Sequence, residues 1–295
     1  METLSRDHCP LCGSRDIRPF RRGTVDPEKL SAADFRITDN RYGSLWTFHL
    51  CQDCKFVFSN PAPGAESLEA MYSSLEDSEY SLEADNRGRN FSIILNRLEK
   101  IIPSGGHLLD VGAASGIFMH LARERGFRVH GVEPSAQLVR EARERYGLEV
   151  IQGTVDQLPA GTTYQVITCL DLIEHMADPL AELRRITTRL APGGILVLVT
   201  PDIRSLAARL TGRRWWHYRI AHVNFFSRPS LDRLISLLGL KTISRRRYAW
   251  HFSLFYLVTR LWPSLGKRKA LQRILKKIHL KLQLLDSWEV YARKN

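Results

Sequence analysis

The sequence predicts an α/β protein in which a mostly parallel sheet is covered by helices on both faces. Short and almost continuously apolar runs alternate with helical stretches between residues 107 and 201. A turn of small residues joins the first of these runs to the helix after it. Ahead of this region lie two Cys-x-x-Cys pairs, which predict a small additional module in front of the sheet.

Length and composition set the frame for this prediction. A chain of 295 residues that is 44% hydrophobic and 25% charged has room for one α/β domain and smaller additions. Neither a signal peptide nor an apolar run of about 18 residues is found, so we expect a cytoplasmic protein. The net charge of +12 is uneven, because residues 203–295 hold 21 Lys and Arg but only 3 Asp and Glu.

The two cysteine pairs predict a zinc site in residues 1–60. Cys9 and Cys12 form one pair, and Cys51 and Cys54 form the other. Four thiolates can complete a tetrahedral site, and such a site is structural because no coordination position stays open. Strand-like runs at 45–50 and 56–58 flank the second pair, as in a zinc ribbon. The alternative is four unrelated cysteines, one of them redox-active.

The main domain is expected to begin at residue 61. A one-sided apolar pattern predicts a helix that ends before the Pro-Ser-Gly-Gly sequence at 103–106. The first strand, 107–111, then leads through small residues at 112–116 into a helix from 117 to about 125. Glycine allows both a positive φ and a close approach of the backbone to a ligand.

The second strand, 128–132, ends at Glu133, whose carboxylate can accept hydrogen bonds from both hydroxyls of a ribose. These two features alone also fit a dinucleotide-dependent oxidoreductase. Further strands are predicted at 164–170 and 195–201, with a helix at 179–190 between them. After a helix at 229–238, we expect the last two strands at 240–247 and 287–294.

Residues 107–240 resemble the class I S-adenosylmethionine-dependent methyltransferases, most closely the branch with ubiquinone-biosynthesis O-methyltransferases and sugar and natural-product enzymes. Asp110, Gly112 and Gly116 match the family's glycine-turn motif, although Ala114 replaces a frequent glycine. The resemblance implies a Rossmann-like sheet of seven strands. It also implies that the cofactor is bound by Asp110, Gly112, Ala113, Ala114, Gly116, Glu133, Pro134, Val155 and Asp171.

Methyl transfer from a sulfonium needs alignment above all, but a hydroxyl acceptor must also lose a proton. The candidate catalytic residues are Asp171, Glu174 and His175 after the fourth strand, and His222 further along the chain. The resemblance implies a divalent metal such as Mg²⁺ at the first three. The alternative for Asp171 and Glu174 is a structural role, because acidic residues favour the N-terminus of a helix. The alternative for His222 is that it only packs beside Phe225.

Residues 249–285 interrupt the last two strands and are expected to form a basic amphipathic helical insertion before the final strand at 286–295. Apolar residues recur on one helical face, and Lys and Arg lie off it. The apolar positions are Leu271, Ile274, Leu275, Ile278, Leu282 and Leu285. Such a segment suits an anionic membrane surface, the domain itself, a second subunit or, less well, nucleic acid.

We therefore expect a methyltransferase core over 61–248 that acts on a small-molecule, glycan or lipid-linked acceptor. We expect a cytoplasmic location. If the basic segment at 249–285 binds an anionic membrane, the protein would also associate peripherally with that membrane. The alternatives are an RNA methyltransferase and a non-catalytic cofactor-binding scaffold. The sequence predicts neither the acceptor's identity nor the oligomeric state.

Overall fold

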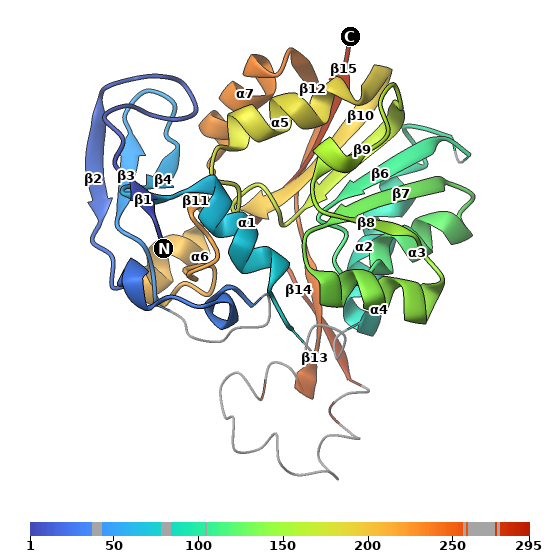
Figure 1. The fold of residues 1–295 in the computed structure, drawn as a ribbon, viewed down its shortest axis with the longest axis horizontal. Helices are drawn as coiled ribbons and strands as arrows, with labels where there is room; N and C mark the ends of the chain where they lie inside the picture. Colours follow the sequence, from blue (N-terminus) through green and yellow to red (C-terminus); the bar gives the residue numbers. More distant parts are fainter. Residues whose placement is uncertain (37–42, 78–83, 104, 256–257, 259–274, 276–277) are drawn as a thin grey trace.

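The fold is centred on one seven-stranded sheet (Figure 1), seen in a computed structural model that describes residues 1–36, 43–77, 84–103, 105–255, 258, 275 and 278–295. The strand order is β12-β15-β10-β9-β6-β7-β8, and β15 alone runs antiparallel to its neighbours within this sheet. This confirms the predicted Rossmann-like architecture. The strands are β6 (His107–Val111), β7 (Arg128–Glu133), β8 (Val150–Gln152), β9 (Tyr164–Leu170), β10 (Leu190–Pro201), β12 (Leu240–Arg247) and β15 (Ser287–Lys294).

Helices cover both faces of the sheet. α2 (Ala84–Leu98) and α3 (Ile117–Glu124) pack on one face, where they meet Ile195, Val197 and Val199 of β10. α5 (Pro179–Thr188) and α7 (Arg228–Leu237) pack on the other, against Leu196 and Leu198. α4 (Ala136–Tyr146) lies beside α3 against β7 and β8. Because both faces are buried, the strands are almost continuously apolar in sequence.

The N-terminal region forms a smaller sheet, which also includes a strand from a much later part of the chain. β2 (Ile17–Arg21), β3 (Phe48–Cys51) and β4 (Val57–Ser59) pair in order, and β11 (Asn224–Phe225) adds the fourth strand next to β4. The expected boundary at residues 60 and 61 stays a prediction. The sheet itself nevertheless joins residues of the first 60 to a segment more than 160 positions later.

Short elements complete the N-terminal and peripheral structure. β1 (Thr3–Leu4) pairs with β5 (Ala62–Pro63), just before α1 (Ala65–Ser73). α6 (Leu206–Thr211) follows β10. The short 3-10 helices are η1 (Pro27–Lys29), η2 (Ala32–Phe35), η4 (Val155–Gln157) and η5 (Gly212–Arg214).

The helix predicted over 271–285 is wrong over residues 278–285. β14 (His279–Leu282) is a strand that pairs antiparallel with β13 (Trp250–Ser253). Apolar residues from Ile278 to Leu284 alternate with polar ones, a period of two that outweighs the helical spacing. Of the earlier part of the expected helix, only Leu275 is described, and it is helical. Among the helices that are described, none is long and apolar enough to cross a bilayer.

Candidate functional site

The turn after β6 has an unusual backbone at the carboxyl edge of the sheet. Gly112, Ala114 and Gly116 all have positive φ, at 74°, 47° and 76°. Glycine at 116 also serves packing, because a Cβ there would lie 2.8 Å from Leu148 Cδ1. The turn ends at the N-terminus of α3, where free backbone N–H groups favour negatively polarised ligand atoms.

Glu133 closes this turn from the end of the neighbouring strand β7. Its side chain is buried, with Oε2 accepting from the Ala114 N–H at 3.0 Å and Oε1 from the Ser135 N–H at 2.9 Å. Burial raises the pKa of Glu133 to about 7. Since a carboxylate oxygen can accept more than one hydrogen bond, both oxygens retain capacity for hydroxyl donors.

Other observations test whether this region fits a ribose-containing cofactor. Ser115 is fully buried in the turn, and its Oγ has no hydrogen-bond partner within the described residues. A buried hydroxyl of this kind calls for a partner. Together with Glu133, it shows that the turn offers polar groups which a bound nucleoside would satisfy, so the residues fit such a cofactor.

The remaining predicted cofactor residues differ in their surroundings. Asp110 is buried and accepts from Thr168 Oγ1 at 2.6 Å, so its carboxylate also ties β6 to β9; burial raises the pKa of Asp110 to about 7. Ala113 packs against α4. Pro134 is half-buried beside Glu133. Val155 belongs to η4 and is buried in the main core.

The residues after β9 form the second part of the edge. Asp171 has a positive φ of 51°, a conformation that costs energy in a non-glycine residue and is typical of functional turns. Burial raises the pKa of Asp171 to about 7. Glu174 is fully buried, and its Oε2 accepts from Thr200 Oγ1 at 2.9 Å while Oε1 has no partner in the described chain. Burial raises the pKa of Glu174 well above its usual range.

The structure brings the two predicted histidines together. The rings of His175 and His222 meet edge to face with centroids 4.7 Å apart. His175 Nδ1 lies 2.9 Å from the Ala221 carbonyl oxygen and 2.8 Å from the Tyr72 hydroxyl. Donation to the carbonyl assigns the proton to Nδ1 and leaves a lone pair on Nε2. Burial lowers the pKa of His175 to about 4, so this imidazole is neutral at physiological pH.

The predicted magnesium site finds no support in this geometry. Apart from the four cysteines, the group of described residues whose ligand atoms lie within 4.8 Å of one another is Glu174, His175 and His222, and Asp171 is not in it. Two imidazoles and one carboxylate are not the oxygen-rich set that Mg²⁺ prefers.

Sequence reasoning missed three residues beside this cluster. Tyr72 comes from α1, and the His217 ring lies parallel to His222 with centroids 5.9 Å apart. His217 Nε2 is 3.2 Å from Oδ2 of Asp286, which is fully buried just before β15. Of the three, Asp286 could have been noticed in the sequence, because it is an acidic residue next to a long basic and apolar stretch. The nearby aromatic residues Trp215 and Tyr218, in contrast, are core.

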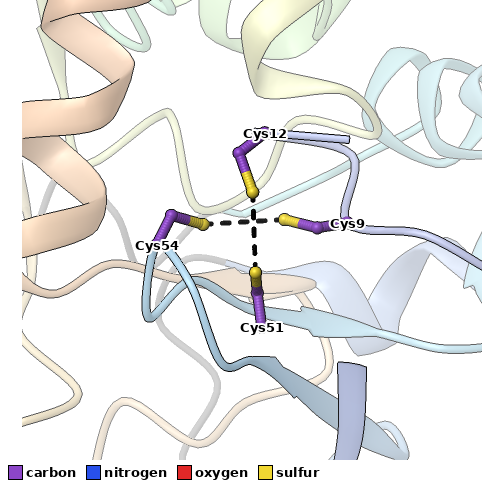
Figure 2. A group of neighbouring side chains, drawn as sticks. All are labelled: Cys9, Cys12, Cys51 and Cys54. Carbon is purple, nitrogen blue, oxygen red and sulfur yellow. Dashed lines mark hydrogen bonds between the residues drawn. The ribbon is translucent and has the colours of Figure 1, made fainter. Parts of the chain in front are cut away.

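The four cysteines converge as predicted (Figure 2). The Cys9 and Cys54 sulfurs are 3.7 Å apart, and those of Cys12 and Cys51 are 3.5 Å apart. Disulfide sulfurs would be about 2 Å apart, whereas tetrahedral ligands with Zn–S bonds of about 2.3 Å are separated by about 3.8 Å. The donor set and its geometry therefore fit zinc. A hydrogen bond from Cys54 lowers the pKa of the Cys9 thiol to about 6.

The region around the cysteine cluster is linked to the histidines through β4 and through Trp46, which precedes β3. The Ser59 N–H donates to the Val223 carbonyl at 2.8 Å, and the Trp46 indole N–H donates to Ile220 at 2.7 Å. In turn, the N–H groups of Val223 and Asn224 both donate to the Glu174 carbonyl at 3.0 Å. Residues 1–60, which we call the cysteine module, thus hold the segment that carries His222 against the loop that carries His175.

Comparison with known proteins agrees with this geometry. A family model described as a methyltransferase domain matches residues 83–245. Ubiquinone biosynthesis O-methyltransferases from Idiomarina loihiensis and Schizosaccharomyces pombe are 33% and 32% identical over 105 and 115 residues. These matches cover 32% and 36% of this chain and 42% of each relative, so the chain spans less than half of their length.

A solved structure, that of the cyclase SpnF, is 18% identical with a TM-score of 0.51, and the match covers 79% of this chain and 97% of that one. At this identity the likeness shows the fold alone. The family match, by contrast, covers more than half of the chain and includes the turn at 112–116, Glu133 and the loop after β9. The chain belongs to the class I S-adenosylmethionine-dependent methyltransferases.

Proposed function

We propose that this enzyme methylates a hydroxyl group of a small-molecule or lipid-linked acceptor at the carboxyl edge of β6, β7 and β9. The observation that carries the cofactor part of the proposal is the position of Glu133, which is buried against the turn with both oxygens anchored by backbone N–H groups. S-adenosylmethionine supplies a methyl group that its sulfonium already activates. Glu133 would hold the ribose, and the turn at 112–116 the methionine part.

The acceptor would lie between this turn and the histidine pair. His175 is held by Ala221 so that Nε2 can take the acceptor's proton. A pKa of about 4 makes His175 available as a base at neutral pH, although it also makes it a weak one. The proton transfer would therefore help most with an acidic hydroxyl, such as that of a phenol. The two named relatives, which are O-methyltransferases, support a hydroxyl acceptor.

We also propose that the cysteine cluster binds zinc in a structural role. All four ligand positions would be filled by sulfur, which leaves none for water or substrate. The contribution of the metal is then to hold β3 and β4, and through β4 the segment 220–224.

The cofactor assignment is tested by Glu133→Ala in calorimetric titration with S-adenosylhomocysteine. Loss of two hydrogen bonds to a charged group should weaken binding by about 100-fold or more. Glu144→Ala, an exposed carboxylate on α4, is the matched control and should bind as the wild type does. Equal affinity in all three proteins would refute the ribose assignment.

The acceptor class is tested by incubating the enzyme with labelled S-adenosylmethionine and a cell extract. Label should enter the organic-soluble or small-molecule fraction. Label found in RNA instead would contradict the proposal while leaving the cofactor site intact.

A further inference from the structure

α6 turns leucine side chains to solvent. Leu206 is 64% exposed and Leu210 is 76% exposed, which are the largest values for a large apolar side chain among the described residues. Because the two residues are four positions apart, they lie side by side on one face of the helix. Ala208 on the opposite face is buried and belongs to the core cluster around Trp215. The helix is therefore anchored through one face and presents an apolar patch on the other.

Positive charge surrounds this apolar patch. Exposed arginines lie just before α6, on α6 and in η5 directly after it; they are Arg204, Arg209, Arg213 and Arg214. Arg209 follows Leu206 at the i+3 position, so it borders the patch on the helix itself. Arg213 Nη2 donates to the Arg22 carbonyl oxygen at 3.0 Å, which brings a further exposed arginine next to η5. Residues 203–231 contain six Arg and no Asp or Glu. We call the two leucines and these arginines the α6–η5 surface.

A bilayer fits this combination of side chains better than a macromolecule does. A stable protein interface buries about 800 Å² on each side, and two leucines supply only a small part of that area. A second copy of the chain would also bring arginine against arginine, and nucleic acid would leave the leucines in water. An anionic bilayer attracts the arginines to its headgroups and takes up the leucines below them. We propose that the α6–η5 surface docks on an anionic phospholipid bilayer.

The α6–η5 surface leads directly into the proposed acceptor side. Trp215, the first residue after η5, is buried, and its ring meets that of His217 with centroids 5.0 Å apart. His222 follows in the same segment, and its ring lies parallel to that of His217. Docking would therefore bring the acceptor side to the membrane surface, where a lipid-linked acceptor is concentrated. Only this last step rests on the proposed function, since docking itself can be measured without methyl transfer.

The role of the leucines is tested by flotation of the full chain with phosphatidylcholine vesicles that contain or lack phosphatidylglycerol. The wild type should float with the anionic vesicles. The double variant Leu206→Ser/Leu210→Ser removes the apolar patch without changing the net charge, and it should bind these vesicles about tenfold more weakly. The matched control is Ile243→Ser, which removes an exposed apolar side chain from β12 and should bind as the wild type does.

The role of the arginines is tested in the same assay. Arg209→Gln/Arg214→Gln removes two positive charges from the α6–η5 surface and should weaken binding to the anionic vesicles about tenfold. Added salt should weaken the binding of the wild type. The matched control, Arg143→Gln/Arg145→Gln, removes two exposed charges from α4, which Figure 1 shows far from α6. This control should bind nearly as well as the wild type does.

The proposal fails if the wild type does not float, if it floats equally with neutral vesicles, or if each control loses as much binding as the variant it matches. Gel filtration is the second readout, because a dimer that Leu206→Ser/Leu210→Ser dissociates would assign the surface to a second copy instead. All substituted side chains are exposed, so thermal unfolding of the four variants should match that of the wild type. Their binding of S-adenosylhomocysteine should also be unchanged, which separates a failure of docking from a failure of the proposed function.

Discussion

The proposed cofactor side and the proposed acceptor side of this site are built in different ways. On the cofactor side, the turn at 112–116, Glu133 and Ser135 come from one strand-turn-helix-strand unit, and they contact one another directly. On the acceptor side, His175 contacts Tyr72 and Ala221, which lie 103 and 46 positions away. One side is formed by local structure. For the other, we infer that the cysteine module, residues 1–60, is needed for its assembly, because Ser59 and Trp46 bind the segment 220–223.

The largest loss of stability and activity should come from a change that removes one of the four cysteines. Cys51 is fully buried and contributes one of the four sulfurs, so Cys51→Ser should release zinc and lower the free energy of unfolding by several kcal/mol. Methyl transfer should be lost, while affinity for S-adenosylhomocysteine should change only a few-fold. Thermal unfolding, metal analysis and calorimetry measure the three quantities.

Cys169→Ala is the control for this change, because Cys169 is also fully buried but lies in β9, outside the cluster. It should keep its zinc and lose about 1 kcal/mol of stability. If Cys51→Ser lost cofactor affinity as completely as activity, the cofactor side would also depend on the cysteine module, which would contradict the comparison.

A smaller effect is expected from pH, and it belongs to the cofactor side. With a pKa of about 7, Glu133 is mostly protonated at pH 6 in the free enzyme, yet both oxygens face N–H donors and the bound ribose adds more. Binding therefore favours the ionised form, and affinity for S-adenosylhomocysteine should fall about tenfold from pH 8 to pH 6. Calorimetry at several pH values measures this slope.

Glu133→Gln is the matched variant for the pH prediction, because an amide cannot ionise. Its affinity should be weaker and nearly independent of pH. If the affinity of Glu133→Gln for S-adenosylhomocysteine still fell at low pH, the titrating group would instead be Asp110 or Asp171. Burial raises the pKa of each of these carboxyls to about 7 as well.

The same contrast explains what sequence could predict. The strands, the turn and Glu133 follow from local patterns, and the structure places them as expected. The convergence of the cysteines was predictable because their spacing encodes it. Tyr72, His217 and Asp286 were missed because tertiary packing alone brings them together. The helix prediction was wrong over 278–285 because two periodicities compete there.

The smallest expected effect concerns the two cysteine turns. Gly13 follows the first pair with φ of 75°, and Lys55 follows the second with φ of 60°, so the same left-handed position holds glycine in one turn and lysine in the other. Left-handed backbone costs a non-glycine residue about 1 kcal/mol. Lys55→Gly should therefore raise the free energy of unfolding by about 0.5–1 kcal/mol and leave cofactor affinity unchanged.

The reverse variant, Gly13→Lys, separates backbone strain from packing. A Cβ at Gly13 would meet no atom within 4 Å, so only the strained φ should act, and stability should fall by a similar amount. Thermal unfolding of both variants measures the pair. Opposite shifts in melting temperature would show that left-handed strain acts equally at the two equivalent positions. A destabilised Lys55→Gly would mean instead that the Lys55 side chain, which donates to the Gln52 carbonyl, outweighs the strain.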